Sequence, residues 1–377
     1  MACTRALVDG VRTPRPAVLS LLAVGAVLAT ATPSVATEEV SPRRLAGPDR
    51  YATAAAIARA TWPEQSEGSR AYRAVVARGD AFPDALAGVN VVGVQDGPVL
   101  LTPFADAPRA TLDVIRDFGI LTMTILGETD VVSTRAEQQI NDALTPYDSS
   151  RIAGRDRYET AARAYTSRYD CYERVPAAVD GMKTAFLASG LQFADAMAAG
   201  PIAFGETVPL LLTAPDRLPA ATRDALAFEG DGPEGSGCGD RQIEQVVIVG
   251  GETVVSADVA QQVADLGYTV RRIAGANRQE TAVRLFEFAE AEFGWAVDHV
   301  NLARGDGFAD AIAGGPHAGR EQAPVLLTIG ADDLGQVTRS FLESRAQTIS
   351  SIDVFGDHTA VSNEVVDDAQ LAATTKG

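Results

Sequence analysis

Short apolar runs that end at a glycine or a polar turn alternate along this chain with longer segments whose apolar residues recur at helical spacing. Residues 75–80, 98–102 and 125–127 are runs of the first kind, and residues 51–60 are a segment of the second kind. Continuous apolar strands are typical of a parallel sheet that helices bury on both faces. The pattern therefore predicts an α/β fold built from β-α-β-α-β-α-β-α units.

The same succession occurs three times. Each cycle opens with the phrase Arg-x-Ala-Gly, at Arg44, Arg151 and Arg272, so the spacings are 107 and 121 residues. Such spacings fit whole domains rather than the short repeats of a solenoid. Because the joints between cycles are only a few residues long, the units should pack against one another. We predict three tandem Rossmann-like or Toprim-like parallel-sheet domains, in a pseudo-threefold arrangement, over residues 41–147, 148–268 and 269–371.

Polar residues mark where the helices should begin. The helix after each Ala-Gly phrase follows an N-cap residue, namely Asp49, Asp156 or Asn277. Glu159 and Glu280 stand three residues after the second and third caps and predict capping boxes. A serine should cap the last helix of each repeat, at Ser133, Ser256 and Ser362.

The first 36 residues resemble a secretory signal. Arg5, Arg12 and Arg15 precede a short apolar run over residues 17–31, and Ser34-Val35-Ala36 suits cleavage. We therefore expect a secreted protein whose mature chain starts at Thr37. We find no second apolar stretch long enough to cross a membrane, so no membrane span is expected.

The charge balance is strongly acidic. The formal net charge is −18, and loss of the signal, with its three Arg and one Asp, would make it −20. That balance argues against nucleic acid and against an anionic membrane surface as partners.

Two cysteines remain after the signal, both in the second repeat. This repeat is longer than the others in two places, and Cys171 and Cys238 each lie in one of these insertions. Both insertions join a helix to the next parallel strand, so both should lie at the same edge of the sheet. We predict a Cys171–Cys238 disulfide, which export would favour, with two free thiols as the alternative.

Repeated polar residues gather at the carboxyl ends of the predicted strands, where open parallel sheets bind ligands. One arginine begins a helix in each repeat: Arg50, Arg157 and Arg278. Another follows the second strand in the first and third repeats: Arg78 and Arg304. An aspartate in the phrase Phe-x-Asp-Ala-x-Ala and a threonine after the third strand also recur: Asp84, Asp195, Asp310, Thr102, Thr213 and Thr328. Guanidinium groups and helix N-termini suit phosphate or carboxylate ligands. The alternative is that each aspartate stabilises its own helix or forms an interdomain ion pair with an arginine.

Catalytic patterns are weaker. The histidines are His299, His317 and His358, all in the third repeat, so no Ser-His or Cys-His arrangement recurs. We find no Gly-x-Ser-x-Gly or His-Glu-x-x-His motif, and we expect no metal site, no cofactor and no enzyme activity. Glycoside hydrolysis with Asp84, Asp195 or Asp310 as general acid or base stays open as the alternative.

Four ordered phrases, repeated three times over roughly residues 43–370, closely resemble the cell wall binding repeat 2 family. They are Arg-x-Ala-Gly-x-Asp-Arg-Tyr-x-Thr-Ala, Phe-x-Asp-Ala-Leu-Ala, Pro-Val-Leu-Leu-Thr and Val-Ile-Val-Gly-Gly-x-x-x-Val-Ser. The second repeat departs from them at Ser189 and Leu191, and the third departs at Asn277 and Gln279. The affected grooves should bind more weakly.

The resemblance implies a monomer with an internal pseudo-trimer and binding grooves between its modules. It implies non-catalytic anchoring to a Gram-positive cell wall through anionic, teichoic-acid-like secondary polymers. The polymer contacts it implies include a strand signature that periodicity alone assigns to the core: Val99, Leu100, Leu101, Leu210, Leu211, Leu212, Val325, Leu326 and Leu327. The acidic background predicts salt-sensitive binding, with divalent cations as candidate bridges. The other readings are an exported enzyme acting on wall glycan and a surface-layer or adhesion protein.

Overall fold

A computed structural model of the chain describes residues 40–63, 70–144, 146–167, 176–228 and 242–375. The predicted signal over residues 1–36 and the predicted partners Cys171 and Cys238 lie outside these ranges. Within them, no helix has both the length and the apolar character needed to cross a membrane.

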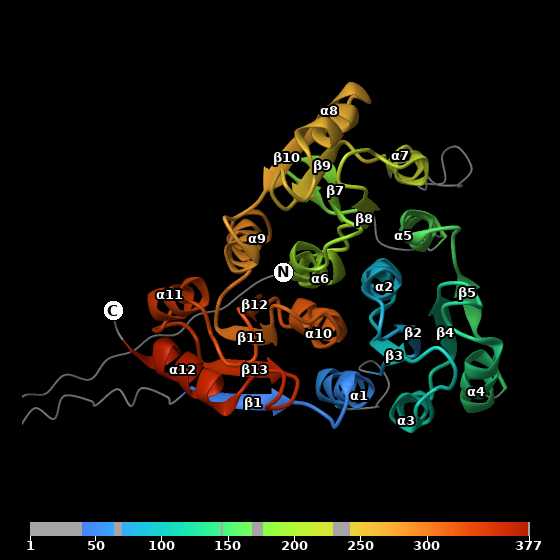
Figure 1. Cartoon of the computed structure of the whole chain (residues 1–377), viewed down its shortest axis with the longest axis horizontal. Helices are drawn as coiled ribbons and strands as arrows, with labels where there is room; N and C mark the ends of the chain where they lie inside the picture. The colour runs from blue at the N-terminus through green and yellow to red at the C-terminus, as the bar shows by residue number, and fades with distance from the viewer. Residues whose placement is uncertain (1–39, 64–69, 145, 168–175, 229–241, 376–377) are drawn as a thin grey trace, which may run out of the picture. The chain divides into compact units, whose positions relative to one another are not determined.

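The described strands form three sheets, which are parallel except for one short hairpin (Figure 1). The first sheet has the order β3-β2-β4-β5 and contains β2 (Arg73–Arg78), β3 (Val99–Thr102), β4 (Thr122–Leu126) and β5 (Ser150–Ile152). The second contains β6 (Ala178–Val179), β7 (Met182–Ser189), β8 (Leu210–Thr213), β9 (Gln245–Val249) and β10 (Thr269–Ile273). The third has the order β1-β13-β11-β12 and contains β1 (Ser41–Leu45), β11 (His299–Arg304), β12 (Val325–Thr328) and β13 (Ser351–Phe355).

Each sheet takes its last strand from the next sequence repeat. Strand β5, which opens the second repeat, pairs with β4 of the first, and β10 of the third repeat pairs with β9 of the second. The cycle closes because β1 pairs with β13, with Ser41 opposite Ser351 and Leu45 opposite Phe355. The sheets are therefore offset by one strand from the sequence repeats, and a repeat alone holds an incomplete sheet.

Helices cover both faces of the sheets (Figure 1). The helix that carries the Phe-x-Asp phrase, which we call the central helix of each repeat, packs against its two counterparts. These helices are α2 (Phe82–Gln95), α6 (Ala194–Gly205) and α10 (Ala309–Arg320). The helix that opens each repeat packs against the central helix of the preceding repeat: α1 (Arg50–Thr61) on α10, α5 (Arg157–Thr166) on α2 and α9 (Arg278–Phe293) on α6. The remaining helices are α3 (Arg109–Phe118), α4 (Thr134–Leu144), α7 (Ala220–Leu226), α8 (Ala257–Asp265), α11 (Gln336–Ser344) and α12 (Asn363–Thr374).

The predicted helix caps form, with one difference. Asp49, Asp156 and Asn277 each accept hydrogen bonds from backbone N–H groups in the first turn of their helix. Glu159 and Glu280 reach one residue further back than a capping box requires, because they accept from the N–H groups of Arg155 and Ala276, which precede the caps.

Three aromatic rings meet where the central helices begin. The ring centroids of Phe82, Phe193 and Phe308 are 5.5, 5.7 and 6.0 Å apart, within the range of favourable edge-to-face contacts. Because each ring comes from the same position of a different repeat, the cluster lies on the pseudo-threefold axis. It brings the starts of the three central helices together at one end of the fold.

A buried amide joins the first and second repeats. Asn90 of α2 is 5% exposed, and its side chain donates to the carbonyl of Leu210 at 2.9 Å and accepts from the N–H of Leu210 at 2.7 Å. Leu210 begins β8, which pairs on one side with β7. The amide thus satisfies backbone groups at the free edge of a buried strand.

We expect Asn90→Leu to lower the free energy of unfolding by about 2–5 kcal/mol, because it leaves two buried backbone groups without partners. Chemical denaturation monitored by circular dichroism measures the change. Gln138→Leu, on the exposed face of α4, is the control. A loss below about 0.5 kcal/mol in N90L, the range of an ordinary surface change, would contradict this role.

Candidate functional site

Three equivalent contacts between repeats, which we call seams, bring the repeated charges together. In the first seam Arg157, at the start of α5, faces Asp84 of α2. In the second seam Arg278 of α9 faces Asp195 of α6. In the closing seam Arg50 of α1 faces Asp310 of α10. Each of these arginines acts electrostatically on the aspartate across its seam.

A glycine lies against each seam aspartate. Gly127, Gly250 and Gly356 follow the last strand of each repeat and have φ of +93°, +108° and +100°. A Cβ atom at these positions would lie 2.9, 2.6 and 2.6 Å from the carboxylate oxygen of Asp84, Asp195 and Asp310, respectively. Glycine is therefore required twice over, by the positive φ and by the close approach of the carboxylate.

The arginines that open the repeats hold the same glycines, a role that sequence reasoning missed. The carbonyls of Gly127, Gly250 and Gly356 accept from Arg151 at 2.6 Å, from Arg272 at 2.7 Å and from Arg44 at 2.8 Å. The recurrence of the Arg-x-Ala-Gly phrase was the available signal. These arginines stabilise the strand exchange between repeats. We therefore assign them a structural role and not a ligand-binding one.

Burial raises the pKa of all three seam aspartates. Hydrogen bonds from Thr160 and Thr281 oppose the rise in the pKa of Asp84 and Asp195. In the closing seam, burial raises the pKa of Asp310 to about 6, and the charge of Asp357 adds to the rise while Arg50 and Arg304 oppose it. Groups that are kept buried at such an energetic disadvantage are candidates for a functional role.

The seam arginines are anchored but not neutralised. Arg50 and Arg157 each donate from Nη1 to a glycine carbonyl at 2.7 Å, and Arg278 donates to the carbonyl of Gly305. The guanidinium of Arg50 lies 5.7 Å from the ring centroid of Phe308, and that of Arg157 lies 5.9 Å from the ring centroid of Phe82. Within the described part of the chain, none of the three forms an ion pair, so the alternative of direct Arg–Asp ion pairs across the seams does not hold there.

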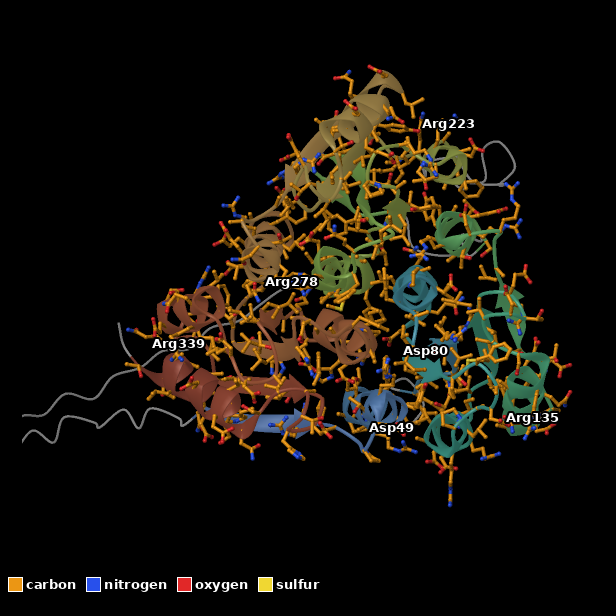
Figure 2. The ribbon with its side chains drawn as sticks, viewed as in Figure 1. Asp49, Asp80, Arg135, Arg223, Arg278 and Arg339 are labelled. Atoms are coloured by element: carbon orange, nitrogen blue, oxygen red, sulfur yellow. The ribbon has the colours of Figure 1, made fainter. Side chains whose placement is uncertain are left out.

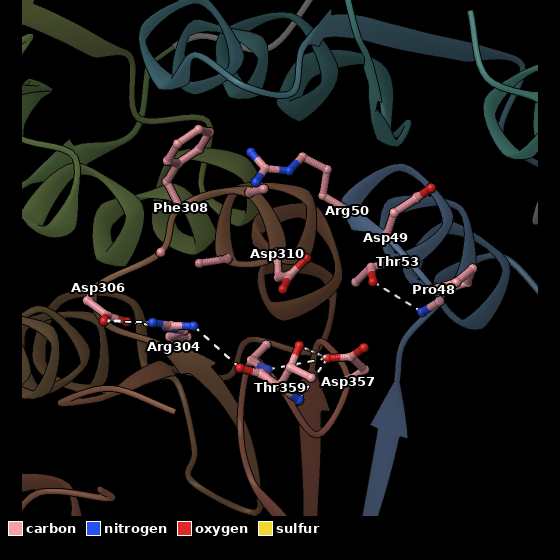
Figure 3. Close-up of a pocket in the computed structure, with 15 residues that line it drawn as sticks. Pro48, Asp49, Arg50, Thr53, Arg304, Asp306, Phe308, Asp310, Asp357 and Thr359 are labelled. Atoms are coloured by element: carbon pink, nitrogen blue, oxygen red, sulfur yellow. Dashed lines mark hydrogen bonds and ion pairs between the residues drawn. The ribbon is translucent and has the colours of Figure 1, made fainter. Parts of the chain in front are cut away.

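The closing seam contains a cavity of about 410 Å³ (Figure 3). It lies between the starts of α1 and α10, and its charged lining residues are Arg50, Arg304, Asp49, Asp306, Asp310 and Asp357. Helix α10 has no side-chain cap at its N-terminus, so its first backbone N–H groups are not satisfied by a cap. The cavity thus combines a helix N-terminus with two guanidinium groups.

Most of the carboxylates in this cavity already have partners. Asp49 caps α1, Asp306 accepts from Arg304 at 2.9 Å, and Asp357 accepts from the N–H of Thr359 at 2.9 Å. Asp310 has no hydrogen-bond partner among the described residues. Arg50 and Asp310 are therefore the two groups here that a ligand can engage without breaking an existing pair.

The second strand ends differently in the second repeat. Arg78 pairs with Asp80, as Arg304 pairs with Asp306. In their place Ser189 accepts from the N–H groups of Leu191 and Gln192, and Leu191 is 54% exposed. The second seam therefore lacks this ion pair and is less polar.

The strand residues that the family resemblance implied as contacts are core residues. Their exposed fractions are 0–2%, and the three threonines, at 0%, donate to nearby backbone carbonyls. Side chains without solvent access cannot touch a polymer, so we assign no ligand contact to these positions: Val99, Leu100, Leu101, Thr102, Leu210, Leu211, Leu212, Thr213, Val325, Leu326, Leu327 and Thr328.

Two of the histidines meet an aspartate that the sequence did not associate with them. Atoms of His299, His317 and Asp353 that could each bind a metal lie within 4.8 Å of one another. The motif search found no such grouping, because it looked only for residues close together in sequence. The three residues come from β11, α10 and β13, and no local spacing connects them.

The sequence profile of cell wall binding domain 2 matches this chain three times, over residues 44–137, 151–260 and 272–366. A protein of Bacillus subtilis (strain 168) named N-acetylmuramoyl-L-alanine amidase LytC is 31% identical over 246 residues, which are 65% of this chain and 42% of that protein. The Amidase enhancer of the same organism is 24% identical over 328 residues, 87% of this chain and 41% of that protein. The chain thus spans less than half the length of these relatives.

Two solved structures from Clostridium difficile share the fold. Cwp6 superposes with a TM-score of 0.72 at 22% identity, over 90% of this chain and 48% of Cwp6. Cwp8 superposes with a TM-score of 0.69 at 22% identity, over 90% of this chain and 53% of Cwp8. These likenesses confirm the predicted α/β architecture of three repeats.

Asp310 should destabilise the protein at neutral pH. Its pKa is about 6 in the folded state against 3.8 ordinarily, so the folded state binds the proton more tightly than the unfolded chain does. Stability is therefore lost as the pH rises from about 4 through about 6. We expect Asp310→Asn to raise the free energy of unfolding at pH 7 by about 3 kcal/mol and to have little effect at pH 3.5, as measured by denaturation at both pH values.

Asp306→Asn, in the same cavity, is the matched control. Because Arg304 holds the pKa of Asp306 below its ordinary value, removing this charge should not stabilise the protein at pH 7. Equal stabilisation by D306N and D310N would show that general charge repulsion, rather than the burial of Asp310, is responsible.

Proposed function

This chain belongs to the cell wall binding domain 2 family, and we propose that it anchors non-covalently to a Gram-positive wall by holding an anionic secondary polymer in its three seams. The family also indicates a secreted protein associated with the cell wall. The observation that carries the proposal is the threefold recurrence of an arginine and a largely buried aspartate that act on each other electrostatically without forming an ion pair.

The closing seam offers a specific mode of binding. Arg50 presents guanidinium N–H groups that form no ion pair with a described carboxylate, and they suit a phosphate or carboxylate of the polymer. Asp310, when protonated, is neutral and can donate a hydrogen bond to the same anion. When Asp310 is ionised, its carboxylate and that of Asp357 are instead hard oxygen ligands for a divalent cation that bridges to the polymer.

Repetition supports binding over catalysis. The seams surround one axis, which the rings of Phe82, Phe193 and Phe308 mark. A polymer of repeating anionic units can occupy more than one seam, and such linkage raises the overall affinity by factors of about 10²–10⁴ without new contacts. We infer that this anchoring needs no catalytic step.

We expect the triple variant Arg50→Ala/Arg157→Ala/Arg278→Ala to bind purified walls roughly 100-fold more weakly or worse, because it removes the unpaired guanidinium from every seam. Single variants should lose only a fewfold. Sedimentation of the full chain with walls, before and after removal of anionic polymers, measures the affinity.

The matched control is Arg135→Ala/Arg223→Ala/Arg339→Ala, which changes the net charge equally. These arginines lie on the outer helices α4, α7 and α11 (Figure 2) and already pair with Asp106, Asp224 and Asp368. Equal losses in the two triple variants would mean that net charge, and not the seams, governs binding. Wall binding that survives removal of the anionic polymers would refute the proposed ligand class.

Binding should also depend on pH through Asp310. With divalent cations removed by EDTA, we expect the affinity for the purified polymer to be about fivefold higher at pH 5 than at pH 7.5, because protonation removes one negative charge beside the ligand. In Asp310→Asn the affinity should be high at both pH values. An unchanged pH dependence in D310N would exclude this role.

Release of wall sugars by the wild type that D310N abolishes would instead support the glycosidase alternative.

A further inference from the structure

A second cluster of polar side chains lies beneath β1, away from the seam cavity. Asp353 of β13 is 1% exposed, and its Oδ2 lies 2.7 Å from Nε2 of His317 and 3.5 Å from Nε2 of His299. His317 of α10 is also 1% exposed. Arg43 of β1 donates to both carboxylate oxygens of Asp353 from the solvent side, from Nε to Oδ1 at 2.7 Å and from Nη2 to Oδ2 at 2.5 Å.

Both imidazole rings are held by hydroxyl groups on their far sides. Nδ1 of His317 lies 2.9 Å from the hydroxyl of Thr61, and Nδ1 of His299 lies 2.6 Å from the hydroxyl of Ser351. The Thr61 hydroxyl donates to the carbonyl of Ile57 at 2.7 Å, so it accepts from Nδ1–H of His317. Such outer partners fix the tautomer of metal-binding histidines and leave Nε2 free to bind.

Two polar atoms beside this cluster are buried without a hydrogen-bond partner in the described structure. They are Nε2 of His299 and Oδ1 of Asn301, whose side chain is 0% exposed. The Asn301 carboxamide lies beside His299 at the range of a long hydrogen bond, beyond the geometry of a regular one. Buried polar atoms are rarely left unsatisfied, and an ion is one way to satisfy both.

The fold does not need this cluster. In the first repeat Val91 and Thr124 stand where the third repeat has His317 and Asp353, and in the second repeat Ile202 and Val247 stand there. Two of the three sheets are therefore built with apolar or neutral residues at these positions. Because the other two repeats fold without a histidine and an aspartate at these positions, the presence of His317 and Asp353 in the third repeat needs an explanation other than folding.

We propose that His299, His317 and Asp353 bind a divalent transition-metal ion of the zinc type, with Oδ1 of Asn301 or a water as the fourth ligand. Two imidazoles and one carboxylate suit zinc and not magnesium or calcium. Ligand atoms around tetrahedral zinc lie about 3.3 Å apart. The two His–Asp separations, 2.7 and 3.5 Å, are close to that value, and all three ligand atoms lie within 4.8 Å of one another.

Metal binding at this site displaces a cation. Arg43 also competes for Asp353, but its side chain is 56% exposed and can turn into solvent. The bound ion thus takes the place of one guanidinium.

Calorimetric titration of the chelator-treated full chain with zinc tests the proposal. We expect one zinc ion per chain, with affinity reduced roughly 100-fold or more in His299→Gln and in His317→Gln. His358→Gln, which removes the exposed third histidine, should bind as the wild type does. Cobalt in place of zinc should give the visible absorption of a tetrahedral site in the wild type and in H358Q only.

Arg43→Gln tests the site without removing a ligand. If folding, checked by circular dichroism, is intact, the loss of the competing guanidinium should raise zinc affinity about tenfold, the scale of one charge at close range. The proposal is overturned if the wild type binds no zinc, if folded H299Q or H317Q binds as tightly as H358Q, or if folded R43Q does not bind more tightly than the wild type.

Discussion

Completion of each sheet by a strand from the next repeat is the constraint on which the rest of this structure depends. A parallel sheet with an exposed edge carries unpaired backbone groups and invites association with other chains. Here β5, β10 and β1 cover those edges, and the last of these pairings, between β1 and β13, joins residues 310 positions apart in sequence, as the Arg43–Asp353 contact shows. Because every repeat both gives and receives a strand, the repeats cannot turn freely, and the geometry of the seams is fixed.

The chemistry of the seams follows from this exchange. A parallel strand ends where the next repeat begins, so Gly127, Gly250 and Gly356 meet both an incoming arginine and the carboxylate of a central helix. Burying a carboxylate is unfavourable unless it is paired, and the raised pKa of Asp84, Asp195 and Asp310 reflects that. An apolar residue would fill the space at lower free energy. That three repeats keep the acid is the physical reason for treating the seams as sites rather than as packing.

Local physics determined what could be predicted from the sequence. The three repeats, the parallel strands and the caps at Asp49, Asp156 and Asn277 were predicted because each depends on neighbours within a few residues. The strand exchange was not, since the pattern of β1 suits β4, β9 or β13 equally and the choice rests on distant partners. For the same reason the glycine contacts of Arg44, Arg151 and Arg272 and the meeting of His299, His317 and Asp353 went unforeseen. The family resemblance implied contacts at strand residues, such as Leu100, that periodicity had already assigned to the core.

The closing seam differs from the other two because it must join the two ends of the described chain. The first and second seams connect consecutive segments, so β5 and β10 are delivered to their sheets by a short piece of chain. Strand β1 has no such tether to β13, and its register needs another source of specificity. Arg43 stands opposite Asp353 in the ladder, whereas the equivalent residues of β4 and β9 are Thr124 and Val247, which offer a guanidinium no counter-charge. Pairing β1 with either of those strands would leave Arg43 without its carboxylate and the buried Asp353 without this cation, which disfavours both alternatives. The ion pair therefore favours β13 as the partner of β1.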